Sequence, residues 1–182
     1  VDIIDERFNG GESERRIMTG VEAIDEYTHG FNLTDLIVVG GTPSMGKTEF
    51  MMKLVNGCST EDGGALVFSM EMDEYQLIER SVAIEAHLPL SCARSPRGME
   101  TEDWAKFTEG MGIVRSKDFH VLDQAGLTVN EICATATNHK MKFPNTKLIA
   151  VDYIGLIPVS KSDRHDIAVG EISRQLKQSA KV

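Results

Sequence analysis

The 182-residue sequence is short of cysteine and of long apolar runs, and each shortage excludes a class of protein. Its three cysteines, Cys58, Cys92 and Cys133, are odd in number and far apart, so neither a disulfide framework nor a zinc site is expected. No apolar run approaches the roughly 18 to 20 residues that cross a bilayer. The first residues, VDIIDERFNGGESERR, lack the apolar core of a signal peptide. We therefore expect reduced thiols, a cytoplasmic location and no membrane partner.

An excess of positive charge is also missing. The formal net charge is -9, so the chain as a whole is not a basic coat for nucleic acid. Any contact with DNA or RNA would have to come from a local basic loop or from a ring of subunits. What the sequence does have is an ordinary globular composition, 41% hydrophobic and 26% charged, and the length of about one domain.

Short apolar stretches alternate with helical patterns along the chain. Strands are expected at 36–39, 65–70, 119–123 and 147–157, and helices at 19–31, 47–57, 73–88, 101–112 and 127–143. A last helix carries one apolar face made of Ala168, Ile172, Leu176 and Ala180. This alternation predicts an α/β fold, with a mostly parallel sheet wrapped by helices on both faces. Ligands of such sheets bind beyond the carboxyl ends of the strands.

Polar residues and glycines indicate where several helices begin and end. Asp73 with Gln76, Thr101, and the capping box of Thr128 with Glu131 predict three helix starts. Gly30 predicts the end of the first helix, and a glycine the end of the helix at 101–112. The stretches 91–99 and 158–166 are expected to be loops.

One stretch between an expected strand and an expected helix carries the strongest chemical signal. It fits the pattern G-x-x-x-x-G-K-[ST], in which glycines let successive backbone N–H groups converge on a phosphate. A Gly-rich turn with an exposed lysine is the alternative, but both motif and context favour a nucleotide site. We expect Lys47 to reach the β- and γ-phosphates of ATP and Thr48 to hold Mg²⁺. The expected nucleotide-binding residues are Gly41, Thr42, Pro43, Ser44, Met45, Gly46, Lys47, Thr48 and Glu49.

Acidic residues follow the later strands. Asp152 comes after the apolar run LIAV and is expected to complete the magnesium site, although a helix cap or turn would also explain it. Glu71 stands just past the second strand, where a base that orients the attacking water would be placed. Asp123, at the end of the third strand, is a weaker competitor for that role, and the residues alone do not decide between a catalytic and a solvated Glu71.

Several strings in order resemble one family. TPSMGKTEF, LVFSMEM, EDWAKF, GLTVNEI, LIAVDYIGLI and GEISRQLKQSAK resemble the motor domain of DnaB-type replicative helicases, over about 19–181. The resemblance implies a RecA-like P-loop NTPase at 19–182 that follows the end of an interdomain linker at 1–18. It implies a homo-hexameric ring that hydrolyses ATP with Mg²⁺ while moving along single-stranded DNA. Lys47, Thr48 and Asp152 carry over, and Glu71 becomes the expected catalytic glutamate beside Lys47.

The resemblance also implies partners and differences. Lys161, Arg164 and His165 lie where the family has a loop facing the channel, although a solvated loop would explain them equally well. Gly155 stands where the family commonly has a glutamine. The family domain continues with a further strand and an arginine finger. In RecA-like sheets that further strand lies between the strand before the P-loop and the strand that ends at Asp152. We therefore expect an incomplete sheet and slow hydrolysis by this chain alone, with primase and helicase loader bound by other parts of the full-length protein.

Three other functions fit parts of the sequence. A RecA- or clock-protein-like ATPase would share the P-loop, the glutamate and the strand ending at Asp152. A small-molecule kinase would need arginine-rich lid segments, for which 91–99 offers only Arg94 and Arg97. A nucleotide-binding module without turnover is the third alternative.

Overall fold

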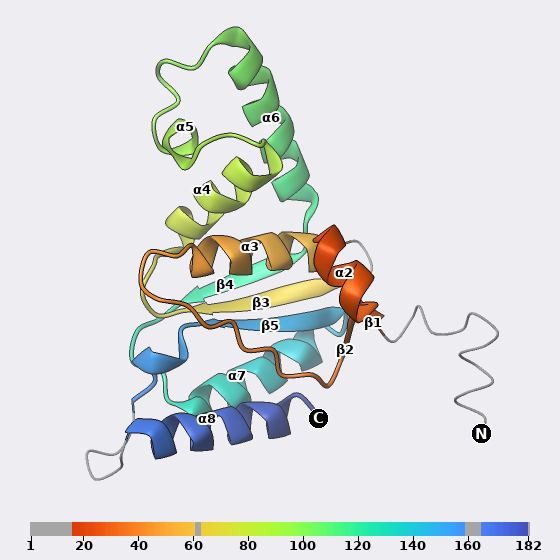
Figure 1. Cartoon of the computed structure of the whole chain (residues 1–182), viewed down its shortest axis with the longest axis vertical. Coiled ribbons are helices and arrows are strands. Elements are labelled where there is room, and N and C mark those ends of the chain that lie inside the picture. Colours follow the sequence, from red (N-terminus) through yellow and green to blue (C-terminus); the bar gives the residue numbers. More distant parts are fainter. Residues whose placement is uncertain (1–15, 61–62, 159–164, 182) are drawn as a thin grey trace, which may run out of the picture.

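The computed structural model describes residues 16–60, 63–158 and 165–181, and its centre is a three-stranded parallel sheet (Figure 1). The strands are β3 (Gly64–Ser69), β4 (Phe119–Asp123) and β5 (Thr146–Asp152), in the order β4-β3-β5. All six residues of β3 are buried, because this strand lies between the other two and helices cover both faces. The parallel α/β sheet predicted from the alternation of patterns is confirmed.

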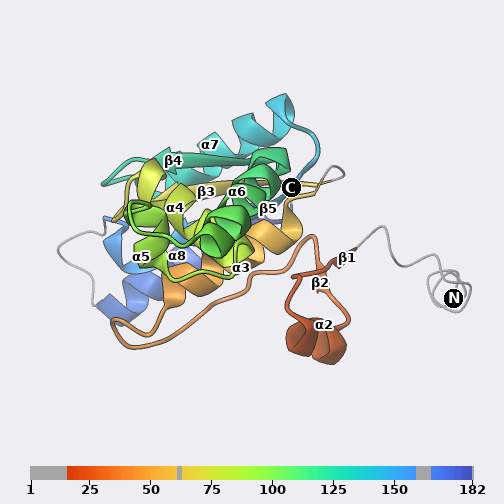
Figure 2. The ribbon, with the colours of Figure 1, turned by 90° about the horizontal axis from the view of Figure 1, so that it is seen from above.

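Two helices pack on each face of the sheet (Figures 1 and 2). On one face, α3 (Lys47–Cys58) and α4 (Glu74–Glu85) share a core with the odd-numbered β3 residues Ala65 and Val67. On the other face, α7 (Val129–Lys142) and α8 (His165–Ser179) pack on Leu66 and Phe68. Successive strand residues therefore bury side chains on opposite faces, which is the pleat of a β-strand.

The predicted caps of two of these helices are present. Asp73 accepts a hydrogen bond from the backbone N–H of Gln76 at 2.8 Å, and Thr128 forms a capping box with Glu131. Ala168 and Ile172 of α8 are buried against the sheet, as the apolar face predicts. Lys161 and Arg164 lie outside the described residues, and so does the side chain of His165.

Two helices beyond α4 form the projection at the top of Figure 1. They are α5 (Leu90–Arg94) and α6 (Thr101–Ser116). The prediction of a loop at 91–99 is wrong at its start, because α5 occupies 90–94. The predicted cap and end of α6 are also wrong: Glu100 is the N-cap residue, and the helix continues through Gly110 and Gly112. Gly110 does not end the helix because its bare Cα packs against Ala86, where a Cβ would lie 2.8 Å from the Ala86 Cβ.

A short hairpin precedes the P-loop. β1 (Arg16–Ile17) pairs antiparallel with β2 (Phe31–Asn32), and α2 (Glu22–Thr28) lies between them. The left-handed backbone of His29 and Gly30 ends α2, as predicted for Gly30. The carboxylate of Asp25 accepts hydrogen bonds from the Thr19 N–H and hydroxyl, both at 2.8 Å, and so fixes the start of this unit.

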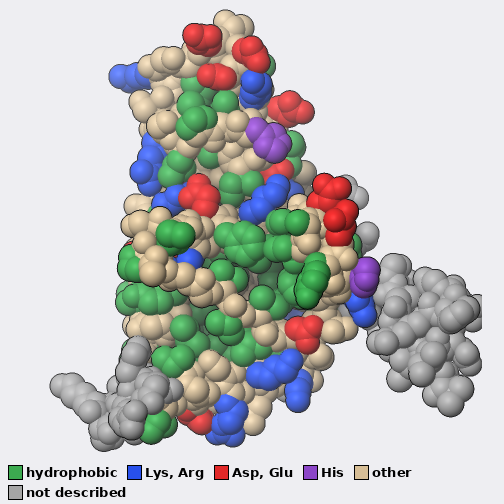
Figure 3. All heavy atoms as spheres, in the orientation of Figure 1, with side chains coloured by type: hydrophobic (Ala, Val, Ile, Leu, Met, Phe, Trp, Pro, Cys, Tyr) green, Lys and Arg blue, Asp and Glu red, His purple; other side chains and the backbone are tan. Residues whose placement is uncertain are grey.

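The predicted strand at 36–39 is absent, and the predicted strand at 147–157 is shorter than expected. Residues 36–39 pair with no strand, and Ile37, Val38 and Val39 are exposed by 41%, 70% and 43%. β5 ends at Asp152, and a 3₁₀ turn, η2 (Ile154–Leu156), follows it. Within the described residues, the outer edge of β5 has no partner strand. Hydrophobic side chains gather on the face over which residues 36–39 run (Figure 3).

No helix within 16–60, 63–158 and 165–181 combines the length and the apolar character needed to cross a bilayer.

The two glycines of α6 offer a matched test of the packing between α6 and α4. Gly110→Ala should lower the free energy of unfolding by about 1–3 kcal/mol, because the new methyl group meets the backbone of Ala86. Gly112→Ala should raise the free energy of unfolding by about 0.5–1 kcal/mol, because alanine favours a helix. Apart from its chain neighbours and the backbone of its own helix, no described atom lies within 4 Å of the new Cβ. Urea unfolding of both variants measures the difference. Equal effects would contradict the close helix contact.

Burial sets the chemistry of the Cys58 thiol. Its Sγ donates to the carbonyl of Met18 at 3.4 Å, and burial, together with the charge of Asp25, raises the pKa of Cys58 to about 11. At pH 8 roughly one thousandth of this thiol is ionised, and the rate of alkylation should rise with pH up to about 11. We expect iodoacetamide to label the half-buried Cys92 and Cys133 well before Cys58, as followed by peptide mass spectrometry. Equal labelling at pH 8 would show that Cys58 is not buried.

Candidate nucleotide-binding site

The P-loop of this chain turns into α3 through two residues with left-handed backbone. Ser44 has φ 63° and Gly46 has φ 79°. Gly46 is the N-cap residue of α3 and supplies no side chain to its first N–H groups. The free N–H groups and the positive end of the helix dipole therefore face the loop, which favours an anion there. Sequence reasoning anticipated the glycine but not the left-handed Ser44.

Lys47 lies over the loop that precedes it. Its Nζ donates to the carbonyl oxygens of Gly41 and Thr42, at 3.0 and 2.9 Å. Residues 41–46 are exposed, so the loop and its ammonium group are accessible from solvent. The lysine thus lies among the backbone groups that the motif assigns to phosphate binding.

Thr48 and Asp152 meet although 104 positions separate them. The Thr48 hydroxyl donates to Oδ2 of Asp152 at 2.7 Å. Asp152 ends β5 and is only 7% exposed, while Thr48 lies in the first turn of α3. This hydrogen bond joins the P-loop helix to the carboxyl end of the sheet.

Glu71 lies at the same edge of the sheet, in the loop between β3 and α4. Its residue is exposed, whereas Met70 before it is 8% exposed and packs in the core with Ile132. The N–H of Met70 donates to the carbonyl oxygen of Asp152 at 3.0 Å. The structure therefore brings the segments that carry Lys47, Thr48, Asp152 and Glu71 to one edge.

Two acidic residues considered from the sequence have structural partners. Glu49 forms an ion pair with Arg80 of α4, with 2.8 Å between Oε2 and Nη1, so its carboxylate joins α3 to α4. Asp123 accepts a hydrogen bond from the N–H of Glu74 at 3.1 Å. Nothing in the sequence signalled this contact, because it joins a strand end to a helix start that comes earlier in the chain.

The oxygens of Thr48 and Asp152 fit a small divalent cation. Mg²⁺ prefers hard oxygen ligands and is usually held by one or two protein groups together with substrate phosphates and water. The hydroxyl and carboxylate, 2.7 Å apart, match that donor set. Within 16–60, 63–158 and 165–181, no group of three or more His, Cys, Asp or Glu residues could hold a metal ion by itself.

Gly155 has a local reason. A Cβ at this position would lie 2.6 Å from Cε2 of Tyr153, so the tyrosine ring occupies the space that a longer residue would need. The turn after Asp152 is thus built around a glycine rather than around the glutamine that the resemblance leads one to expect.

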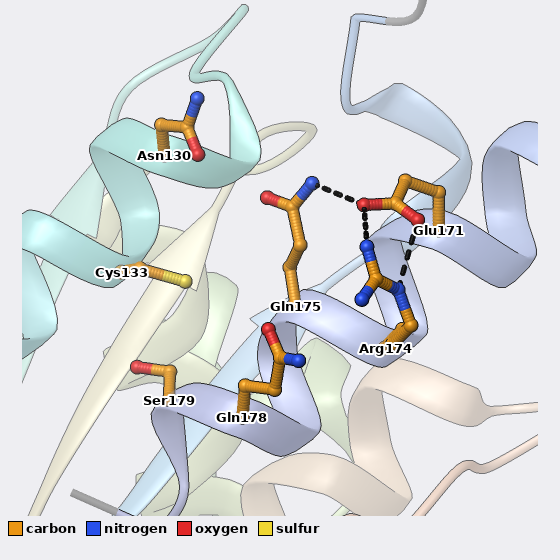
Figure 4. A pocket seen from close by; sticks show the side chains of 7 residues that line it. All are labelled: Asn130, Cys133, Glu171, Arg174, Gln175, Gln178 and Ser179. Carbon is orange, nitrogen blue, oxygen red and sulfur yellow. Dashed lines mark hydrogen bonds and ion pairs between the residues drawn. The ribbon is translucent and has the colours of Figure 1, made fainter.

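A hollow lies between α7 and α8 and involves none of these residues (Figure 4). Within it, the Glu171 carboxylate accepts hydrogen bonds from Arg174 and from Gln175. Its charged groups therefore pair with each other. The lining residues are Asn130, Cys133, Glu171, Arg174, Gln175, Gln178 and Ser179.

A parallel sheet, a glycine-rich loop that opens a helix, and a buried aspartate at a strand end define a P-loop nucleotide-binding protein. The family described as DnaB-like helicase C terminal domain matches residues 16–182, and the chain belongs to this family. The resemblance seen in the sequence is thereby confirmed.

Curated relatives are replicative helicases of bacteria. The chain is 36% identical over 168 residues to the replicative DNA helicase DnaB of Pasteurella multocida, covering 91% of this chain and 36% of the relative. It is 34% identical over 168 residues to the replicative DNA helicase DnaC of Bacillus subtilis, covering 91% and 37%. The chain thus spans just over a third of the length of these relatives.

Solved structures agree with the fold. The structure titled "The Structure Of A DnaB-Like Replicative Helicase And Its Interactions With Primase" superposes with a TM-score of 0.86 at 25% identity, covering 99% of this chain and 44% of that chain. The ATPase domain of G40P gives a TM-score of 0.83 at 25% identity, covering 99% and 66%. The RecA-like fold class is confirmed by these neighbours.

The contact between Thr48 and Asp152 can be tested without any ligand. Thr48→Val keeps the shape of the side chain but leaves the buried Asp152 carboxylate without this donor. We expect a loss of about 1–3 kcal/mol in the free energy of unfolding, measured in urea. Thr48→Ser is the control, because it keeps the hydroxyl and should lose less than about 1 kcal/mol. If both variants are equally stable, the hydrogen bond does not hold α3 to the sheet.

Proposed function

We propose that this chain is the ATP-hydrolysing motor domain of a replicative DNA helicase. The observation that carries the proposal is the hydrogen bond between Thr48 and Asp152, which sets the P-loop helix beside the strand end in a chain of the DnaB-like family. Hydrolysis of ATP would drive translocation on single-stranded DNA and the unwinding of duplex at the fork. Since the chain spans just over a third of its curated relatives, this activity is proposed for the full-length protein.

The P-loop residues would bind the phosphates of ATP. The N–H groups at the start of α3 donate to them, and Lys47 adds a positive charge beside the β- and γ-phosphates. Thr48 and Asp152 would hold Mg²⁺, which neutralises charge on the phosphates when bound. Among the nine residues assigned to this site from the sequence, Glu49 would act indirectly, by fixing α3 against Arg80.

Glu71 would act as the base that orients and deprotonates the attacking water. It is exposed on the loop that joins β3 to α4, and its neighbour Met70 is hydrogen-bonded to the backbone of Asp152. A carboxylate in this place needs only to reach the water beside the γ-phosphate, because the electrostatic stabilisation comes from Lys47 and the cation.

The partners follow from family membership and from charge. This chain carries a net charge of -9, so contact with single-stranded DNA would rest on local basic groups that a homo-hexameric ring brings together. Primase and the helicase loader would bind other parts of the full-length protein. One structural neighbour is described with its interactions with primase.

The test is ATP hydrolysis by the full-length gene product, with and without single-stranded DNA. Lys47→Ala should weaken nucleotide binding and abolish turnover. Glu71→Gln should bind ATP but lower turnover by roughly 10²- to 10⁴-fold, because the base is removed and the binding groups remain. Lys53→Ala, in the same helix, and Glu74→Gln, three residues beyond Glu71, are the matched controls and should retain turnover and its stimulation by DNA.

One result would contradict the helicase function, and another would contradict the role of Glu71. Nucleotide binding without DNA-responsive turnover in the wild type would leave a nucleotide-binding module, one of the alternatives considered from the sequence. Full turnover in Glu71→Gln would remove this residue from its proposed role while leaving the helicase function intact.

A further inference from the structure

The three strands of the sheet end on one polar rung. Asp123 of β4 pairs with Ser69 of β3, and Ser69 pairs with Asp152 of β5. Two residues earlier in each strand, Val121, Val67 and Ala150 pack in the core under α3 and α4. Because side chains two residues apart share a face, the polar rung lies on the same face as this core, where α3 and α4 begin.

Each member of the rung holds a different piece of backbone or side chain. Asp152 accepts from the hydroxyl of Thr48. Ser69, which is 2% exposed, donates to the carbonyl oxygen of Met72 at 2.6 Å and accepts from its N–H at 3.2 Å. Asp123 accepts from the N–H of Glu74, the first residue of α4.

The loop between β3 and α4 is therefore fixed at both ends. At its start, Met70 is buried in the core formed with α7 and α8, and at its end Met72 packs on the opposite core, formed with α3 and α4. The single residue between these two anchors is Glu71. Its backbone position is set by the contacts of its neighbours rather than by contacts of its own side chain.

Asp123 joins the far end of this loop, at the start of α4, to the neighbouring strand β4. The first N–H groups of a helix have no partner within the helix, and a carboxylate near them is favoured by the helix dipole. Asp73 supplies the cap from within the loop, at 2.8 Å from the N–H of Gln76. Asp123 supplies a second acceptor from 49 residues away, at 3.1 Å, and so ties the start of α4 to the end of β4.

From this geometry we infer that Asp123 is a positioning residue for Glu71: by holding the start of α4, it fixes the loop that carries the glutamate. The inference rests on the proposed role of Glu71 in ATP hydrolysis. A base acts only within hydrogen-bond reach of the water, and a displacement of about 1 Å can cost roughly 10²-fold in rate. Asp123 itself does not touch the nucleotide in this assignment.

The test compares Asp123→Ala with Asp123→Asn in the full-length gene product. Alanine removes the acceptor, so kcat for ATP hydrolysis should fall roughly 10- to 100-fold. KM for ATP should change little, because the P-loop contacts remain. Asparagine keeps an oxygen for the N–H of Glu74, and should restore most of kcat. Asp103→Ala is the matched control: it removes a half-buried acid from the first turn of α6, away from the rung, and should leave both constants unchanged.

Two kinetic outcomes would overturn the inference. If Asp123→Ala leaves kcat unchanged, the contact does not position the loop. If Asp123→Asn is as slow as Asp123→Ala, the carboxylate itself is needed. Asp123 would then be the catalytic base, the role for which the sequence made it the weaker candidate.

A second measurement separates this inference from the proposed function. Amide hydrogen exchange at residues 70–76 should become faster in Asp123→Ala, while that of α7 stays unchanged. If the wild type hydrolyses no ATP, the proposed function fails, and unchanged exchange at 70–76 would then also overturn the positioning role. Acceleration confined to 70–76 would support it whether or not ATP is turned over.

Discussion

In-register pairing of β4, β3 and β5 is the constraint on which the candidate site depends. Among the residues that face α3 and α4, one set is apolar, namely Val121, Val67 and Ala150. The set two residues further along each strand is polar, namely Asp123, Ser69 and Asp152. A slip of one strand by a single residue would turn its polar end to the other face of the sheet, under α7 and α8. The buried apolar rung therefore fixes not only the fold but also which side chains meet the start of each helix.

Local pattern and capping predicted those elements whose partners are also local or whose burial is complete. β3 is apolar from Ala65 to Phe68 and lies between two strands, and α7 begins at the capping box that Thr128 and Glu131 form. The predicted strand at 36–39 is absent because a strand needs a neighbour: its β-branched residues fit a sheet, but no described strand pairs with them. The predicted end of α6 is wrong because Gly110 packs against Ala86 at the end of α4, and no pattern within 101–112 reveals that contact.

The site divides in the same way. The P-loop motif specifies Lys47 and Thr48 by spacing, since consecutive backbone groups must surround one anion, and the apolar run before Asp152 indicates a strand end. Both Glu71 and Asp123 are acids that follow a strand, so the sequence made Asp123 only a weaker competitor and did not decide whether Glu71 is catalytic or solvated. Their difference is tertiary: the Asp123 carboxylate accepts from the backbone of α4, whereas Glu71 stays exposed between the buried Met70 and the partly buried Met72.

The segments that flank the P-loop differ in how firmly they pack. The better packed one is α3, which carries the anion-binding N–H groups. On the side of α3, Met52 and Val55 are fully buried, and the hydroxyl of Thr48 is bonded to Asp152. On the other side, Ile37, Val38 and Val39 are exposed and unpaired. The first N–H groups of α3 are therefore held in place before any phosphate binds, so their alignment costs little at the moment of binding. A displacement of 36–40 would not move these donors, because their positions are set by the packing of α3 on the sheet.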